Sequence, residues 1–426
     1  MKGIKLLAII IIVFALSACG SVDTITKLES SNYAPKIKYT EYKDSREALE
    51  NFDYNYLKQN SSNKYLMVAD IFELINNNNY DEAIKILNSE MKIETDAELS
   101  EIYKTLLLEL LFTKYKWNDI LALKDTGEGS IVYTAFAATY RNQPAELIEF
   151  AQTNNVLPFE ISKSGTPIVE ITINGHKSHF FVDTGAGMTV VSSDVAEECG
   201  LLPLGDNNIE ATAATTKTIG IDAALINSLQ IGGVTIKNHP SIIVDSKHLK
   251  FKLFGIFTYF NIEGIIGWNA LQNLGMTLDY TKNQIEFYDG KANPKNHSGN
   301  NMFWLGYPVI KLNSENGDNL LFGLDTGGKT SCLQDKIIDR FGLDFTEEEI
   351  ELGSAGGFAT IPSKKIDSLK VFLSPVKSIL FKNINTHPLE AATLIKLDGT
   401  IGSDLFKDSI VEIDFQNNYF DVRRDD

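Results

Sequence analysis

The stretch FFVDTGAG, residues 180–187, ends an apolar run on a carboxylate, a hydroxyl and a glycine. A second stretch, LLFGLDTGGK at residues 320–329, has the same form. An aspartate at the end of a strand is most often a turn residue or the cap of the next helix. The repetition of this aspartate with the same neighbouring residues indicates instead that the two segments have the same role in two related halves of the chain.

The repeat extends well beyond these two segments. EGIIGWNAL at 263–271 matches DGTIGSDLF at 398–406, and MTLDYTKNQIEFY matches VEIDFQNNYFDV further on. Asp183 and Asp325 are 142 residues apart, and Gly267 and Gly402 are 135 apart. An ordered series of matches of this kind predicts two similar β units. Two lobes facing each other across a pseudo-twofold axis would place Asp183 beside Asp325.

Two carboxylates in contact cannot both ionise cheaply, so they share one proton. The ionised member can take a proton from water while the protonated member polarises a carbonyl group. Such a pair suits hydrolysis of an amide by directly activated water, without a covalent intermediate.

The residues next to the two aspartates suit the same geometry. Gly185 and Gly327 allow the backbone to turn sharply beside each acid. Thr184 and Thr326 carry hydroxyls that can bond the opposite loop and hold the two loops in place.

These motifs resemble those of the aspartic proteases, both retropepsin-like and pepsin-like, over roughly residues 165 to 424. The resemblance rests on DTGA at 183–186, DTGG at 325–328, IIG at 265–267 and TIG at 400–402. It implies an aspartic endopeptidase that acts on a peptide or protein substrate and needs no cofactor or metal.

The resemblance also assigns roles and an oligomeric state. Asp183 and Asp325 would be the catalytic pair, supported by their Thr-Gly neighbours. Both lobes lie in one chain, as in pepsin, so a monomer would be complete. The sequence departs from the family at residues 187 and 328, which are both glycine. By position, residues 211–221 and 352–362 are the candidates for the flap hairpins that cover substrate in this family.

The N-terminus points to an envelope location. Lys2 and Lys5 precede an apolar run, and LSAC at 16–19 follows. This layout is typical of a secretory signal and resembles the lipobox of bacterial lipoproteins, which implies acylation of Cys19. We expect a chain anchored in a lipid bilayer of the bacterial cell envelope, at the outer membrane, on its periplasmic or surface side. The net charge of −17 argues against a nucleic-acid partner.

The sequence therefore predicts a multidomain α+β protein. Its parts would be a signal peptide at 1–18, a tether at 19–60, a helical domain at 61–156, and protease lobes at 157–292 and 300–426. The helical domain would be an all-α array of helical hairpins similar to tetratricopeptide repeats, and the two lobes would be mostly β.

Two other interpretations remain open at this stage. GLDTGGKT at 323–330 fits the GxxxxGK[ST] pattern of a phosphate-binding loop, although Asp325 would repel phosphate and the first copy lacks the lysine. The chain could also be an inactive protease-like scaffold that binds peptides. Cys199 and Cys332 could pair in an oxidising compartment, but two cysteines are no disulfide framework and we expect two buried free thiols.

Overall fold

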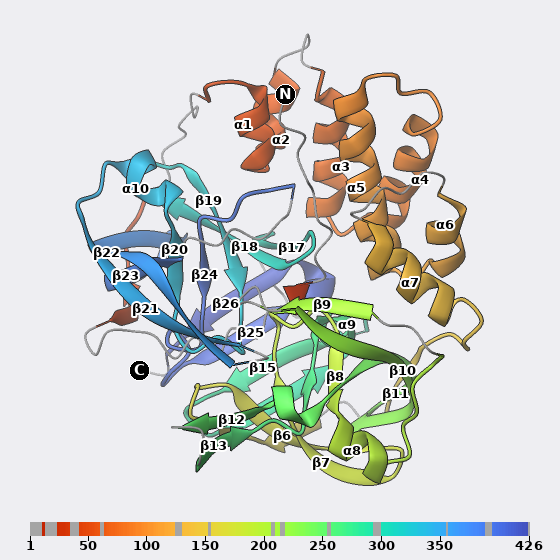
Figure 1. The fold of residues 1–426 in the computed structure, drawn as a ribbon. Helices are drawn as coiled ribbons and strands as arrows, with labels where there is room; N and C mark the ends of the chain where they lie inside the picture. Colours follow the sequence, from red (N-terminus) through yellow and green to blue (C-terminus); the bar gives the residue numbers. More distant parts are fainter. Residues whose placement is uncertain are drawn as a thin grey trace.

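The computed structural model describes most of the chain (Figure 1). The residues it describes are 11–12, 24–34, 42–59, 64–123, 130–151, 155–205, 209–213, 218–253, 257–292, 300–354, 357–387 and 394–424.

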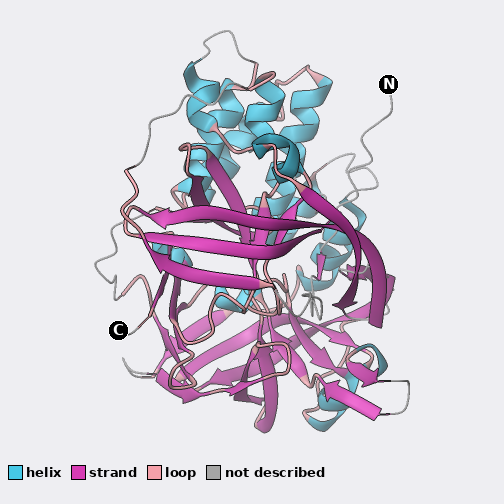
Figure 2. Cartoon of the chain, turned by 90° about the vertical axis from the view of Figure 1, so that its left-hand side faces the viewer, coloured by secondary structure: helices cyan, strands magenta, loops and turns pink. Residues whose placement is uncertain are grey.

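A group of helices forms one end of the molecule, above the strands (Figures 1 and 2). Its members are α1 (Ser45–Glu50), α2 (Tyr54–Gln59), α3 (Leu66–Asn76), α4 (Tyr80–Glu90), α5 (Ala97–Thr113), α6 (Trp117–Ala122) and α7 (Ile131–Tyr140). The longest, α5, begins where the Asp96 side chain accepts hydrogen bonds from the backbone N–H groups of Glu98 and Leu99, which satisfies two donors that the helix itself leaves open.

The helical segment differs from the prediction at both ends. Helices α1 and α2 lie inside residues 19–60, which the sequence assigned to a tether. At the other end, Leu147–Phe150 form strand β3, which pairs with β11 of the first sheet. Residues 155–158 form β4, at the edge of a third sheet. Short segments of this kind take their structure from the sheet edge that they meet, which local periodicity does not reveal.

The tether prediction is also wrong for residues 25–30. They form β2 (Ile25–Ser30), which pairs antiparallel with β23 along its whole length. Tyr33 then stacks on Phe372, with ring centroids 4.1 Å apart. The N-terminal segment is thus an edge strand of the second lobe. Within the predicted signal peptide, β1 (Ile11–Ile12) pairs with β9.

The first large sheet and its helices form lobe 1. Its strands, after β1 and β3, are β5 (Glu160–Ile161), β6 (Pro167–Ile173), β7 (His176–Val182), β8 (Thr189–Ser192), β9 (Ile209–Ala213), β10 (Thr218–Ile231), β11 (Val234–Val244) and β14 (Gly264–Ile266). Helices α8 (Ser193–Glu198) and α9 (Trp268–Leu271), a 3-10 turn at Ser246–His248 and a small hairpin of β12 (Lys250–Leu253) and β13 (Phe257–Asn261) complete it.

The second large sheet forms lobe 2. Besides β2, it contains β17 (Met302–Trp304), β18 (Pro308–Ser314), β19 (Asn319–Leu324), β20 (Cys332–Gln334), β21 (Phe345–Ser354), β22 (Gly357–Ser374), β23 (Lys377–His387) and β24 (Gly399–Ile401), with helix α10 (Lys336–Phe341).

The two large sheets have matching strand orders. Lobe 1 runs β10-β11-β8-β14-β7-β6 and lobe 2 runs β22-β23-β20-β24-β19-β18. In each lobe the strand that ends in Asp-Thr-Gly lies parallel to the short strand of the IIG or TIG element. Each repeat of the sequence is therefore one sheet with its own loop.

A third sheet joins the lobes. Its strands are β4 (Asn155–Pro158), β15 (Gly275–Asp279), β16 (Gln284–Tyr288), β25 (Ile410–Asp414) and β26 (Tyr419–Arg423), with a 3-10 turn at Phe415–Asn417. Strands β15 and β25 are repeat equivalents and pair antiparallel, Gly275 opposite Asp414 and Asp279 opposite Ile410. This register is what a twofold axis between the two strands requires, because each strand then faces its own copy.

Helices and lobes share a continuous hydrophobic core. Trp304 stacks on Trp268 across the lobes, with centroids 5.2 Å apart, and its Nε1 donates to Oγ1 of Thr113 on α5 at 3.0 Å. The helices are thus packed on the lobes rather than tethered to them. In the part of the chain described, no helix is both long and apolar enough to cross a membrane.

Candidate active site

Asp183 and Asp325 directly follow β7 and β19, and both are buried, with 2% and 1% of their surface exposed. The backbone N–H of Asp183 donates to Ile266 O at 3.1 Å, and that of Asp325 donates to Ile401 O at 3.0 Å. Each loop therefore begins as an extension of the pairing between its strand and the IIG or TIG element of the same lobe.

The two threonines bind the loops to each other. The backbone N–H of Thr184 donates to Oγ1 of Thr326 at 3.0 Å, and the reverse bond has the same length. The hydroxyl of Thr184 donates to Leu324 O and that of Thr326 to Val182 O, each at 2.7 Å. This reciprocal, fully buried network holds the strand ends of the two lobes in one fixed arrangement.

The two glycines let each carboxyl reach the opposite loop. A Cβ atom on Gly327 would overlap the carboxyl of Asp183, whose Oδ1 would lie 2.5 Å away. A Cβ atom on Gly185 would lie 2.7 Å from Oδ1 of Asp325. Real Cβ atoms do not approach other atoms this closely, so any side chain at either position would push the opposing aspartate away. The folded chain thus brings together all six residues that the sequence singled out for this site.

The two carboxyls are held by backbone donors and by each other. Oδ1 of Asp183 accepts from the N–H groups of Gly185 at 2.8 Å and Ala186 at 3.2 Å, and Oδ1 of Asp325 accepts from Gly328 at 2.8 Å. Burial raises the pKa of Asp183 to about 6. The backbone hydrogen bonds and the bond to Asp325 act in the opposite direction and lower this pKa, but burial has the larger effect. Burial, and then the charge of Asp183, raise the pKa of Asp325 well above its ordinary range.

Oδ2 of Asp325 is buried and meets no hydrogen-bond donor among the described residues. An unmatched carboxylate oxygen would be costly there, whereas a protonated oxygen can donate to Asp183. The two pKa directions agree with this arrangement. Both pKa directions are those expected of two buried carboxyls that share one proton.

The raised pKa values predict how stability depends on pH. Both carboxyls bind protons more tightly in the folded than in the unfolded chain, so their contribution is complete below about pH 4 and is lost as the pH rises through about 6 and beyond. We expect Asp325→Asn to raise the melting temperature relative to wild type at pH 8 but not at pH 4, as measured by thermal melts. An equal difference at both pH values would contradict this.

A second pair of polar residues supports each loop from below. Oγ1 of Thr189 donates to Oδ1 of Asn269 at 3.0 Å, and Oγ of Ser331 donates to Oδ1 of Asp404 at 2.7 Å. These pairs are equivalent in the repeat, at offsets of 142 and 135 residues. Neither pair was predicted from the sequence, although both copies carry a hydroxyl and a short polar side chain at these positions.

Lobe 1 has an additional buried group at this point. His239 is fully buried, and it bonds Oγ1 of Thr189 at 2.7 Å through Nε2 and a Glu146 carboxylate oxygen at 2.5 Å through Nδ1. Glu146 comes from the segment after α7, so the connection from the helical part reaches the support of the lobe 1 loop. The pair is too distant in sequence for a motif to reveal it.

Both flap candidates are β-hairpins. Residues 211–221 fall on β9 and β10, which pair as Thr212 with Thr218, and residues 352–362 fall on β21 and β22, which pair as Ser354 with Gly357. Their turns, 214–217 and 355–356, lie outside the described residues. The hairpins occupy equivalent positions in the two strand orders.

The phosphate-loop interpretation of residues 323–330 does not fit the fold. Such a loop needs a helix that begins at its lysine, so that the helix N-terminus faces the phosphate. Here β20 follows, and the next helix begins only at Lys336.

Cys199 and Cys332 are both unpaired. Among the described residues, no group of three or more His, Cys, Asp or Glu side chains could hold a metal ion.

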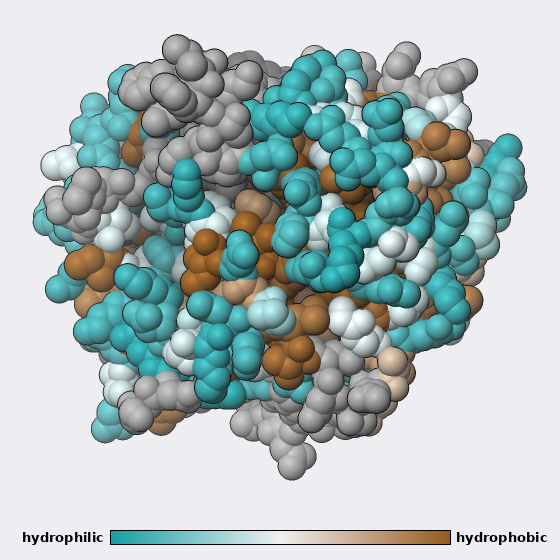
Figure 3. All heavy atoms as spheres, turned by 90° about the horizontal axis from the view of Figure 1, so that it is seen from below, coloured by the Kyte–Doolittle hydropathy of each residue, from teal (hydrophilic) through white to brown (hydrophobic). Residues whose placement is uncertain are grey.

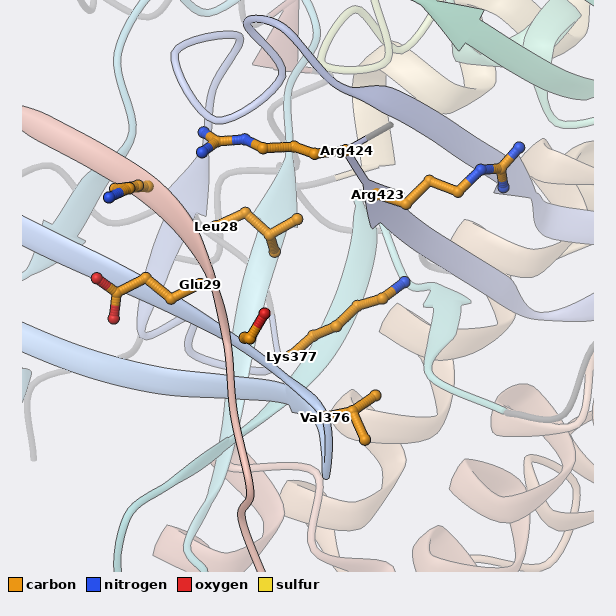
Figure 4. Close-up of a pocket in the computed structure, with 8 residues that line it drawn as sticks. Leu28, Glu29, Val376, Lys377, Arg423 and Arg424 are labelled. Atoms are coloured by element: carbon orange, nitrogen blue, oxygen red, sulfur yellow. The ribbon is translucent and has the colours of Figure 1, made fainter. Parts of the chain in front are cut away.

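A cavity of about 520 Å³ lies away from the aspartates, at the edge of lobe 2. Figure 4 shows three of its basic side chains, Lys377, Arg423 and Arg424, around the space beside β2. Lys377 pairs with Asp421 at 2.5 Å and Arg423 with Glu412 at 3.0 Å. On the face seen from below Figure 1, hydrophobic residues gather in a central band between hydrophilic ones (Figure 3).

Comparison with known families agrees with the lobe 1 geometry. Residues 169–273 match the family model described as "gag-polyprotein putative aspartyl protease". The match covers β6 to α9, with the first Asp-Thr-Gly loop and the IIG element. This supports an aspartic protease-like family and, at that level, a hydrolase. The structure is mostly β with barrel-like sheets and some helices, which is compatible with that fold.

One curated relative and one solved structure are also similar to parts of the chain. The UBA domain-containing protein Mud1 of Schizosaccharomyces pombe is 49% identical over 45 residues, 11% of this chain. The chain spans only 14% of the length of that relative. Among solved structures, basic 7S globulin from soybean is similar at 12% identity, with a TM-score of 0.37, over 64% of this chain and 95% of that one.

Proposed function

We propose that the chain is an aspartic endopeptidase in which Asp183 and Asp325 activate water for attack on a peptide bond. The observation that carries the proposal is the buried pair itself, in which each carboxyl lies against the glycine of the opposite loop. Asp183, with the lower pKa, would be the base, and Asp325, which holds the proton on Oδ2, would be the acid that polarises the peptide carbonyl.

The test is hydrolysis of a quenched-fluorescence peptide library by the chain from residue 20 onward. The whole of this chain is needed, because β2 belongs to the lobe 2 sheet and α5 holds Trp304. A statine-type inhibitor should compete, since its hydroxyl mimics the tetrahedral intermediate. No hydrolysis between pH 4 and pH 8, together with no binding of the inhibitor, would reject the proposal.

The alternative is an inactive protease-like scaffold that binds peptides. The buried pair argues against it, because two carboxyls with raised pKa values destabilise the fold at neutral pH and a binder gains nothing from them. Peptide binding that is unchanged by loss of either aspartate, without hydrolysis, would favour the scaffold.

We further propose that the protein is a lipoprotein anchored through Cys19, as the lipobox-like LSAC implies. Only six residues lead from Cys19 to Ile25, the start of β2, which allows a span of at most about 21 Å. Lobe 2 would therefore lie close to the bilayer, with the edge that carries β2 and the basic cavity nearest to it.

We expect Cys19→Ala to move the protein from the membrane fraction to the soluble fraction, because the acyl chains provide the attachment. Immunoblots of fractionated cells measure this directly. Cys199→Ala is the matched control, since Cys199 is a buried free thiol of lobe 1, and it should leave the protein with the membranes. Retention of the Cys19→Ala chain in the membrane fraction would contradict acylation.

A further inference from the structure

Tyr307 is an aromatic side chain that lies at the aspartate pair and has no aromatic equivalent in lobe 1. In lobe 1, Ile168 of β6 pairs with Phe181 of β7; in lobe 2, Val309 of β18 pairs with Gly323 of β19. Counting back two residues from each makes Thr166 and Tyr307 equivalents, both followed by proline.

In both lobes this residue reaches the Asp-Thr-Gly loop of the other lobe. The hydroxyl of Thr166 donates to Gly327 O at 3.1 Å. The phenol oxygen of Tyr307 lies at Gly185, 2.9 Å from where a Cβ atom would be. The short side chain of Thr166 reaches only the backbone of the opposite loop, whereas the longer side chain of Tyr307 extends past the backbone of Gly185. Oδ1 of Asp325 lies 2.7 Å from the same point, so the phenol and this carboxylate oxygen flank one position above Gly185.

In lobe 2 the absence of a side chain at Gly323 leaves room for the ring. A Cβ atom on Gly323 would lie 2.6 Å from Cε1 of Tyr307. The equivalent residue in lobe 1 is Phe181, which is buried. Lobe 1 thus combines a small Thr166 with a large Phe181, and lobe 2 reverses the sizes. A change at position 307 or position 323 alone would leave either a clash or a cavity. The glycine at 323 therefore forms the space that the Tyr307 ring fills.

The helical part helps to hold this tyrosine. Trp304 is bonded to α5 through Thr113 and stacked on Trp268. Gly306, at φ +71°, then turns the chain beside Glu109 of α5. The ring of Tyr307 is buried. Burial, the negative charges of Asp325 and Asp183, and a hydrogen bond to the Asp325 side chain all raise the pKa of the Tyr307 hydroxyl.

We propose that Tyr307 is a positioning residue that donates its phenol hydrogen to Oδ1 of Asp325 and so leaves Oδ2 as the oxygen of that carboxyl that exchanges the shared proton. Oδ1 then accepts from Gly328 and from Tyr307 and cannot carry the proton, while Oδ2, which has no donor among the described residues, faces the transfer. Lobe 1 has no counterpart, because Thr166 bonds a backbone carbonyl. The asymmetry would confine proton exchange at Asp325 to one oxygen, with no equivalent tyrosine at Asp183. This inference rests on the proposed function only for its effect on rate.

The test is a titration that needs no substrate. The protonation of the pair is followed by the carboxyl C=O stretch in infrared difference spectra, with Asp325→Asn to assign the band. Tyr307→Phe keeps the ring against Gly323 and removes only the hydroxyl. Because the lost donor stabilises the ionised form, we expect the upper apparent pKa of the pair to rise by about one unit. If the protein hydrolyses peptides, kcat should fall by about tenfold with KM unchanged.

Tyr280→Phe is the matched control. Tyr280 is another buried tyrosine, packed on Phe159, and its hydroxyl has no partner among the described residues. It should leave the titration unchanged. Placing 3-fluorotyrosine at position 307 makes the phenol a stronger donor and should lower the same pKa. An unchanged or lowered pKa in Tyr307→Phe, or an equal shift in Tyr280→Phe, would overturn the proposal. Absence of hydrolysis by the wild type would reject the proposed function and leave this titration fully readable.

Discussion

We expect Asp183→Asn and Asp325→Asn each to lower kcat/KM for a cleaved peptide by about a thousandfold or more, since loss of the base or the acid removes proton transfer from the reaction. Asparagine has nearly the same shape and can still accept the loop N–H bonds. The loss would therefore come from chemistry and not from misfolding. Initial rates of peptide cleavage, with circular dichroism to verify the fold, measure this.

The matched control is Asp194→Asn on α8. Asp194 is surface-exposed and pairs with Lys250 at 2.7 Å, and exposed pairs of this kind contribute little. Its rates should equal those of the wild type. Full activity in either variant of the buried pair would exclude the proposed mechanism.

The second large effect is expected from Gly327→Ala. The new methyl group would overlap the Asp183 carboxyl, so the carboxyl must leave its place opposite Asp325. A displacement of this size at a reacting group costs about a hundredfold in rate, and the strain should also lower the melting temperature. Cleavage assays and thermal melts of the same preparation separate the two effects.

Gly342→Ala provides the comparison. Gly342 follows α10 at φ +59°, and a Cβ atom there meets open space. Its replacement should cost about 1 kcal/mol of backbone strain and leave the rate unchanged. If Gly327→Ala loses only as much activity as Gly342→Ala, the close approach of Gly327 to Asp183 is not what the reaction requires.

Several features could be predicted from the sequence because the chain states them twice. The Asp-Thr-Gly loops, the glycine elements beneath them and the strands around them recur in the same order. Comparing the two copies within this chain therefore indicates which residues form the site, as comparing two related proteins would. The two copies also differ in side-chain size at Tyr307 and Gly323. This difference could not be interpreted from the sequence, because only the structure shows that the Tyr307 ring packs against Gly323.

Other features could not be predicted because they depend on a partner surface. Residues 25–30 have the composition of a polar linker and become a strand because β23 offers an unpaired edge. Likewise, Leu147–Phe150 follow a helical segment and become a strand on β11. Glu146 reaches His239 only through this pairing.

The sequence by itself determined that two equivalent acidic loops exist and which residues compose them, since repetition and local turn chemistry are properties of the chain. Only the tertiary structure decided how the two acids differ. That difference arises from burial, from the unmatched Oδ2 of Asp325 and from a tyrosine present in one lobe alone. These are relations between atoms that lie far apart along the chain, and they exist only once both lobes and the helices are packed together.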